Sequence, residues 1–135
     1  MSNLKFDAET SEQLIRDVRP LTITYHGYKK TFDMPGWYPM GEGEGTFVGD
    51  DLLVYDKAIK ELKTEAEHLL IPEEIREIRQ KLNLTQAQAG NILGGGKTAF
   101  QKYESGKTLP SRAISNLLRV LSAQPELMRV LPKFG

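Results

Sequence analysis

The spacing of apolar residues changes part-way along the chain, and this change predicts two structurally different halves. Between residues 71 and 135, apolar residues recur three and four positions apart in short segments separated by glycine, serine or proline. Such spacing is typical of amphipathic helices, and the separating residues commonly begin or end them. We therefore expect a compact bundle of five helices. Their predicted positions are Glu73–Lys81, Thr85–Leu93, Lys97–Ser105, a helix capped by Ser111, and a last helix with Pro125 in its first turn.

The second predicted helix has clear end signals. The Thr85 hydroxyl can accept a hydrogen bond at the start of the helix, and Gln88 can return one in a capping box. Gly94–Gly96 follow Leu93 directly, and three successive glycines cannot continue a helix without a large loss of entropy. A tight turn into the third helix follows from this pattern.

The third predicted helix has an apolar and a polar face. Phe100 and Tyr103 lie three positions apart, so both rings should point inward, and Gly106 should end the helix. Small residues at Ala89 and Gly90 should let this helix cross the preceding one closely. The two rings should pack onto apolar positions of the first helix, namely Ile75, Ile78 and Leu82.

The outward face of the third helix should carry Lys97, Thr98, Gln101 and Lys102. Glutamine can pair with adenine through two hydrogen bonds, lysine reaches guanine acceptors or phosphates, and the threonine methyl suits a thymine methyl. A helix with such a face, joined to another by a tight turn, predicts a helix-turn-helix that enters the DNA major groove.

The first half of the chain has a different pattern. Alternating apolar and polar residues predict a β-hairpin, and a long apolar stripe predicts a helix that covers it because an isolated hairpin is marginally stable. We expect an α+β fold with an interaction module over residues 1–70 and a DNA-binding domain over residues 71–135. The predicted N-terminal elements are a short helix at Asp7–Val18, strands Leu21–Tyr25 and Tyr28–Phe32 around a His26-Gly27 turn, a short extended piece at Pro35–Pro39, a loop at Met40–Gly49, and a helix from Asp50 or Asp51 to about Leu69 with Tyr55, Ile59, Leu62, Ala66 and Leu69 on one stripe.

The net charge of zero conceals an asymmetry between the two halves. Residues 1–67 contain 8 Lys and Arg against 13 Asp and Glu, whereas residues 68–135 contain 10 against 5. A basic half with a predicted DNA-binding motif and an acidic half without one indicate two modules with different partners. The alternative is that such small counts vary by chance.

The composition argues against several other classes of protein. The chain has no cysteine and only two histidines, so a disulfide framework and a thiolate zinc site are excluded and metal binding is not expected. No apolar run is long enough to span a membrane and the N-terminus lacks a signal pattern, so we expect no membrane partner and a cytoplasmic location. No nucleophile–base pair or carboxylate dyad is visible, so we do not expect an enzyme.

At this point two resemblances appear. Ile75 to Leu131 resembles the Cro/C1-type helix-turn-helix domain of repressors, and a narrower set of residues is similar to the MqsA antitoxin family. That family consists of dimeric antitoxins whose C-terminal domain binds operator DNA and whose N-terminal domain masks an mRNA-cleaving toxin. The Cro/C1 resemblance rests on Leu84-Thr85-Gln86, Tyr103-Glu104-Ser105-Gly106-Lys107 and Leu109-Pro110, and the narrower one on Leu93–Gly96, Ala99-Phe100, Tyr103-Glu104, Leu117–Leu121 and Pro125–Leu127.

The N-terminal half resembles this family only in its layout. The family has a zinc module with two C-x-x-C pairs around a short hairpin, and here Pro39 and Glu42 take the place of the second pair while the first has no counterpart. We therefore expect no zinc cofactor. Packing of Trp37, Tyr25, Phe32 and the Tyr55–Leu69 stripe should stabilise this half instead.

The resemblance also assigns roles to individual residues. It implies that Gln86, with Thr85 nearby, binds a phosphate, that Thr98, Gln101 and Lys102 contact base edges, and that Lys97 and Lys107 supply charge to the DNA backbone. The family's Asn and Arg base-contacting positions align with Thr98 and Lys102. Because lysine lacks the bidentate geometry of arginine, the family's operator sequence cannot be transferred to this chain.

Two functions fit these observations. The first is an antitoxin of a type II pair, which neutralises a partner mRNA-cleaving toxin and represses its own operon by binding double-stranded palindromic operator DNA as a homodimer. The second is a stand-alone transcription regulator whose N-terminal half serves dimerisation or ligand sensing.

Overall fold

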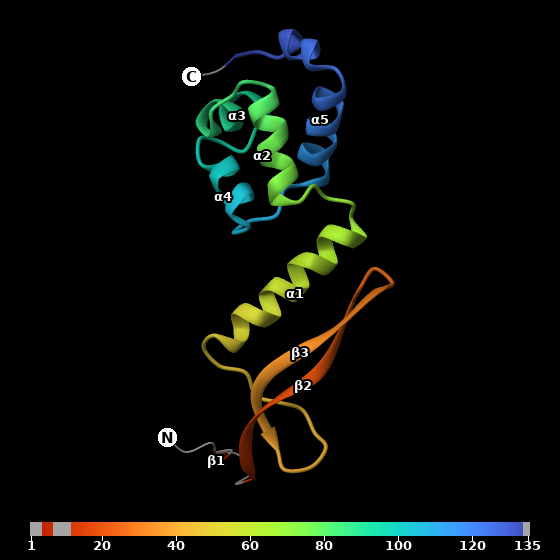
Figure 1. Cartoon of the computed structure of the whole chain (residues 1–135), viewed down its shortest axis with the longest axis vertical. Coiled ribbons are helices and arrows are strands. Elements are labelled where there is room, and N and C mark those ends of the chain that lie inside the picture. Colours follow the sequence, from red (N-terminus) through yellow and green to blue (C-terminus); the bar gives the residue numbers. More distant parts are fainter. Residues whose placement is uncertain (1–3, 7–11, 134–135) are drawn as a thin grey trace. The chain divides into compact units, whose positions relative to one another are not determined.

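A computed structural model describes residues 4–6 and 12–133 of the chain. The fold is α+β, with a small antiparallel sheet followed by helices (Figure 1). The chain divides into two compact units, Met1–Leu62 and Lys63–Gly135. The boundary between these units lies within a helix, eight residues before the boundary predicted between the two functional modules. The division into functional modules stays a prediction.

The sheet of the first unit has three strands in the order β1-β2-β3, namely β1 (Leu4–Phe6), β2 (Gln13–Tyr25) and β3 (Tyr28–Pro39). Strands β2 and β3 form a hairpin in which Tyr25 pairs with Tyr28. His26 and Gly27 in the turn have φ of 48° and 82°, as a type I′ turn requires. The predicted hairpin and its turn are confirmed, and the predicted extended piece Pro35–Pro39 is the end of β3.

The helix predicted over Asp7–Val18 is wrong where it can be checked. Residues 13–18 belong to β2, and residues 7–11 lie outside the described part of the chain. The apolar residues Leu14, Ile15 and Val18 fit a helical face, but Leu14 pairs with Pro39 and Val18 with Pro35 in the β2–β3 ladder. Pairing with a partner strand decided the local structure, which a short pattern cannot specify.

Helix α1 (Asp51–Ala66) packs on the hairpin within the first unit. The rings of Phe32 and Tyr55 meet edge to face with centroids 6.4 Å apart, and Lys30 forms an ion pair of 3.0 Å with Glu61. The prediction that a long helix covers the hairpin is confirmed. The helix ends at Ala66 rather than about Leu69, because the chain turns at residue 68 with φ of 53°.

The core of the first unit contains residues beyond those predicted from the sequence. Leu14, Met34 and Tyr38 are buried, and the Tyr38 hydroxyl donates a 2.6 Å hydrogen bond to the Met34 carbonyl. Trp37 is only half-buried, and the guanidinium of Arg16 lies 5.6 Å from its ring centroid. The predicted packing of Phe32 against the α1 stripe is confirmed, and Trp37 contributes a half-buried ring that packs against Arg16.

The loop between β3 and α1 is held by direct protein contacts. Thr46 pairs with Trp37 through two backbone hydrogen bonds of 2.9 and 2.7 Å. Arg19 donates to the carbonyls of Pro39 and Gly41 at 2.9 and 2.8 Å. Asp51 at the start of α1 is buried and forms an ion pair with Arg16.

A zinc ion does not fit this loop. Proline carries no side-chain donor, the Pro39 carbonyl already accepts from Arg19, and Glu42 is exposed. Among residues 4–6 and 12–133, no three His, Cys, Asp or Glu side chains are placed to hold a metal ion. At the loop position that corresponds to the family's second cysteine pair, Arg19 thus binds the backbone carbonyls of Pro39 and Gly41.

The second unit contains the helical bundle. Its segments are α2 (Pro72–Lys81), α3 (Gln86–Leu93), α4 (Ala99–Ser105), α5 (Arg112–Ala123) and the 3₁₀ helix η1 (Pro125–Val130) (Figure 1). The five predicted helical segments are confirmed, although the last is a 3₁₀ helix. Its buried core consists of Leu70, Ile75, Ala89, Leu93, Ala99, Phe100, Leu118 and Leu121.

The segment before α2 is fixed to α5. The backbone N–H of Leu70 donates to the buried Ser115 hydroxyl at 3.2 Å, and Arg119 donates to the carbonyl of His68 at 2.6 Å. Ser111 caps α5 by accepting from the N–H of Ile114 at 3.0 Å, as predicted. Within the described ranges, no helix has the length and apolar character needed to cross a membrane.

Candidate nucleic-acid interface

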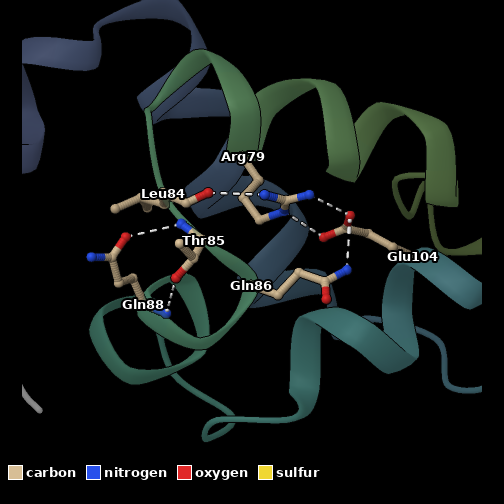
Figure 2. A network of polar contacts seen from close by, with 6 residues as sticks. All are labelled: Arg79, Leu84, Thr85, Gln86, Gln88 and Glu104. Atoms are coloured by element: carbon tan, nitrogen blue, oxygen red, sulfur yellow. Dashed lines mark hydrogen bonds and ion pairs between the residues drawn. The ribbon is translucent and has the colours of Figure 1, made fainter.

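The start of α3 has the predicted capping box. The Thr85 hydroxyl accepts from the N–H of Gln88 at 3.1 Å, and the Gln88 side chain accepts from the N–H of Thr85 at 2.9 Å (Figure 2). Two backbone donors that a helix start leaves without partners are thereby satisfied. The first turn of α3 is fixed by its own sequence.

The turn between α3 and α4 depends on its glycines. Gly94, Gly95 and Gly96 have φ of 113°, 97° and 89°, which other residues rarely adopt. Helix α3 ends at Leu93, as predicted, and the N–H of Gly96 donates back to the Gly90 carbonyl at 3.3 Å. The turn therefore folds back onto the last part of α3.

Gly90 has a different role from the one predicted. A Cβ at this position would lie 1.8 Å from the Gly96 carbonyl oxygen. Gly90 must lack a side chain because the glycine turn approaches it closely, and not because the following helix does. Ala89, its neighbour, is fully buried in the core.

Helix α4 is held by its apolar face. Phe100 is completely buried, and its ring contacts the ring of Tyr103 edge to face with centroids 5.4 Å apart. Tyr103, Ile78 and Leu82 all pack against the cluster that contains Phe100 and Ile75. The predicted inward direction of both rings is confirmed, and Gly106 ends the helix with φ of 79°, as predicted.

The polar residues of the predicted DNA-binding face lie around α4. Gln101 and Lys102 are exposed on the helix, whereas Lys97 and Thr98 are exposed in the turn before it, because α4 begins at Ala99 and not at Lys97. Thr98 is the N-cap residue, and its side chain makes no capping hydrogen bond. Lys107 is exposed just beyond the C-terminal end of α4.

A largely buried ion pair joins α4 to α2. The Arg79 Nε and Nη2 atoms donate to the two oxygens of Glu104 at 2.7 and 2.9 Å, and Nη1 donates to the Leu84 carbonyl at 2.9 Å (Figure 2). The side chains of Arg79 and Glu104 are 12% and 6% exposed. The bidentate geometry fixes the orientation of both side chains, in addition to the electrostatic attraction between them.

This pair controls the electrostatics of α4. The hydrogen bond to Glu104 raises the pKa of Arg79 above its already high ordinary value, so the guanidinium stays charged. Glu104 is the only acidic residue within the stretch 97–107, which also contains three lysines. Because Arg79 neutralises Glu104, the charge that this stretch presents is positive.

Gln86 takes part in the same network. It is the first residue of α3, and its Nε2 donates to the Glu104 Oε1 atom at 3.3 Å (Figure 2). The resemblance implies a phosphate contact for Gln86, whereas the sequence predicts no role for Glu104 beyond its place in a motif. A salt bridge between residues 25 positions apart has no periodic signal, so only the folded structure shows the connection.

Two comparisons with known proteins identify the family of the chain. Residues 5–131 match the family model described as the antitoxin component of the bacterial toxin-antitoxin system, MqsA. The chain is also 30% identical over 118 residues to the Antitoxin MqsA of Escherichia coli (strain K12), a span that covers 86% of this chain and 90% of that protein. The chain therefore belongs to the MqsA antitoxin family.

Proposed function

We propose that this antitoxin represses its own operon by binding palindromic operator DNA as a dimer, with α3 and α4 acting as a Cro/C1-type helix-turn-helix. Helix α4 would enter the major groove, and a two-fold dimer would contact half-sites about 34 Å apart. Family membership favours this antitoxin role over a stand-alone regulator and fits a protein without catalytic activity.

The observation that carries the proposal is the division of α4 into two faces. Phe100 and Ala99 are buried against the bundle, while Gln101 and Lys102 are exposed on the same helix. A short helix with one face fixed in a core and the other polar and basic is suited to contact base edges. We assign base contacts to Thr98, Gln101 and Lys102, as the resemblance implied.

Backbone contacts are assigned to the residues around this helix. Lys97 and Lys107 flank α4 and are exposed, so their ammonium groups can approach phosphates on either side of the groove. Gln86, with Thr85 before it, lies at the start of α3, where N–H groups and the helix dipole favour a phosphate.

The toxin is proposed to bind the N-terminal module, residues 1–70. The excess of carboxylates in residues 1–67 suits a basic partner, and an mRNA-cleaving enzyme must present positive charge to bind its substrate. Masking that surface would block cleavage. The two halves would then act as separate modules with separate partners.

A growth experiment separates the two activities. The full-length chain is expressed with the toxin of the same operon, and a reporter under the operon's promoter measures repression in the same cells. Wild type should restore growth and silence the reporter, whereas a Gln101→Ala, Lys102→Ala double variant should restore growth without silencing. Gln80→Ala with Lys133→Ala, which changes exposed residues of the same types outside both the N-terminal module and α4, should behave as wild type.

Each activity can fail separately. If the double variant silences the reporter as well as wild type does, the proposed base contacts are wrong. If wild type does not restore growth, this toxin is not its partner and the role of the N-terminal module is wrong.

A further inference from the structure

Glu104 accepts hydrogen bonds from two helices at once. Two N–H groups of Arg79 on α2 and one of Gln86 on α3 converge on its carboxylate. Glu104 itself is on α4. One side chain thus connects the three helices that form the candidate interface.

The hydrogen bond to Glu104 determines how the Gln86 carboxamide is oriented. A carboxamide has two N–H donors and one acceptor oxygen, which can exchange places by rotation. The carboxylate accepts only, so Nε2 and not Oε1 must face it, as Figure 2 shows. Gln86 is half-buried, and its second N–H is left for another acceptor.

We propose that Glu104 is a positioning residue for DNA binding, which orients the Gln86 carboxamide so that its second N–H meets a DNA phosphate. The inference rests on the proposed function, because it requires that α3 and α4 bind DNA. A phosphate accepts hydrogen bonds but cannot donate them, so Gln86 can contact it only through an N–H and not through its oxygen. Arg79 makes the arrangement possible by neutralising a carboxylate that would otherwise repel the DNA.

Charge and positioning predict opposite effects of the same substitution. Replacing Glu104 with glutamine removes a negative charge close to the DNA, which by electrostatics alone strengthens binding. It also removes the fixed acceptor, because the new carboxamide can present either a donor or an acceptor to Gln86. Positioning therefore predicts weaker binding.

The experiment measures the affinity of the full-length chain for a fluorescent duplex from the promoter of its own operon. A scrambled duplex of the same length gives the non-specific background. Glu104→Gln should bind the promoter about tenfold more weakly than wild type, the effect expected for one lost hydrogen bond to a charged group. Glu77→Gln, which removes an exposed carboxylate on α2, is the matched control and should bind as tightly as wild type or more tightly.

A double-mutant cycle with Gln86→Met separates positioning from a general structural role. If Glu104 acts through Gln86, adding Glu104→Gln to Gln86→Met causes no further loss. Equal losses in both backgrounds would overturn the inference. So would a Glu104→Gln variant that binds as tightly as the Glu77→Gln control.

A folding control keeps the test decisive. Circular dichroism at the assay temperature shows whether each variant is folded. Should Glu104→Gln unfold, Glu104→Asp replaces it in the cycle, because the shorter side chain keeps the charge for Arg79 but withdraws from Gln86. If wild type shows no preference for the promoter duplex, the proposed DNA binding itself is wrong. This outcome differs from a double-mutant cycle without coupling, which overturns only the role of Glu104.

Discussion

At the scale of the residue, a few atoms decide whether the glycine turn can form. Gly90 is the clearest case, because a Cβ there would lie 1.8 Å from the Gly96 oxygen. That oxygen belongs to backbone which must keep φ near 89°, so it cannot move aside without distorting the turn. The sequence suggested that a small residue was needed at this position, but not which atoms required it.

Gly90→Ala should therefore destabilise the second unit by about 3 kcal/mol or more, as overpacked sites do. The free energy of unfolding, measured with urea and followed by circular dichroism, checks this value. Gly41→Ala is the matched control, since a Cβ at Gly41 would meet nothing within 4 Å. Equal stabilities of the two variants would contradict the described turn.

The Arg16–Asp51 ion pair predicts a dependence of stability on pH. The hydrogen bond from Arg16 lowers the pKa of Asp51 below its ordinary value. A lowered folded-state pKa contributes stability that is fully present above the unfolded value of about 3.9 and is lost as the pH falls through the folded-state pKa. The first unit should thus lose stability in acid below about pH 4.

Trp37 provides the measurement, because it is the single tryptophan of the chain and the Arg16 guanidinium lies over its ring. Urea unfolding followed by Trp37 fluorescence should show the acid loss in wild type. An Asp51→Asn variant should be less stable near neutral pH and should lose less on acidification. A loss of the same size in both proteins would show that Asp51 is not responsible.

At the scale of the element, interactions between neighbouring residues could be predicted from the sequence, and interactions between distant residues could not. The capping box of Thr85 and Gln88 joins residues three positions apart, and it could be predicted. The strand at Gln13–Val18 was mistaken for a helix, because its structure depends on pairing with β3, more than ten residues away. The Arg79–Glu104 pair and the burial of Asp51 were missed for the same reason.

The Thr85 cap gives a test at this scale. Thr85→Ala should reduce the free energy of unfolding by about 1 kcal/mol, because it leaves a backbone donor of α3 without its partner. Thr108→Ala, which replaces an exposed threonine in the loop after α4, should change it by less than about 0.5 kcal/mol. Thermal or urea unfolding compares the two variants. Similar losses would mean that the capping box contributes little to the bundle.

At the scale of the whole molecule, the first unit is stabilised by packing and ion pairs in a chain that has no cysteine. Arg19 binds the loop carbonyls, and Gly36 and Gly45 lie so close to Phe47 that a Cβ on either would come within 2.9 Å of its ring. A chelator such as EDTA should therefore leave the unfolding temperature unchanged, and added zinc should not raise it. A shift in either direction, measured by calorimetry, would contradict this account of the loop.

Recognition of DNA by α3 and α4 is the central proposal at this scale. The most direct measurement is the anisotropy of a labelled promoter duplex titrated with full-length wild type and with the Gln101→Ala, Lys102→Ala variant, against a scrambled duplex. Wild type should bind the promoter duplex specifically, and the variant should lose about 2–6 kcal/mol of specific binding energy, from about 1–3 kcal/mol for each base contact. Specific binding that survives the double substitution unchanged would contradict the account, because the exposed face of α4 would then not contact the bases.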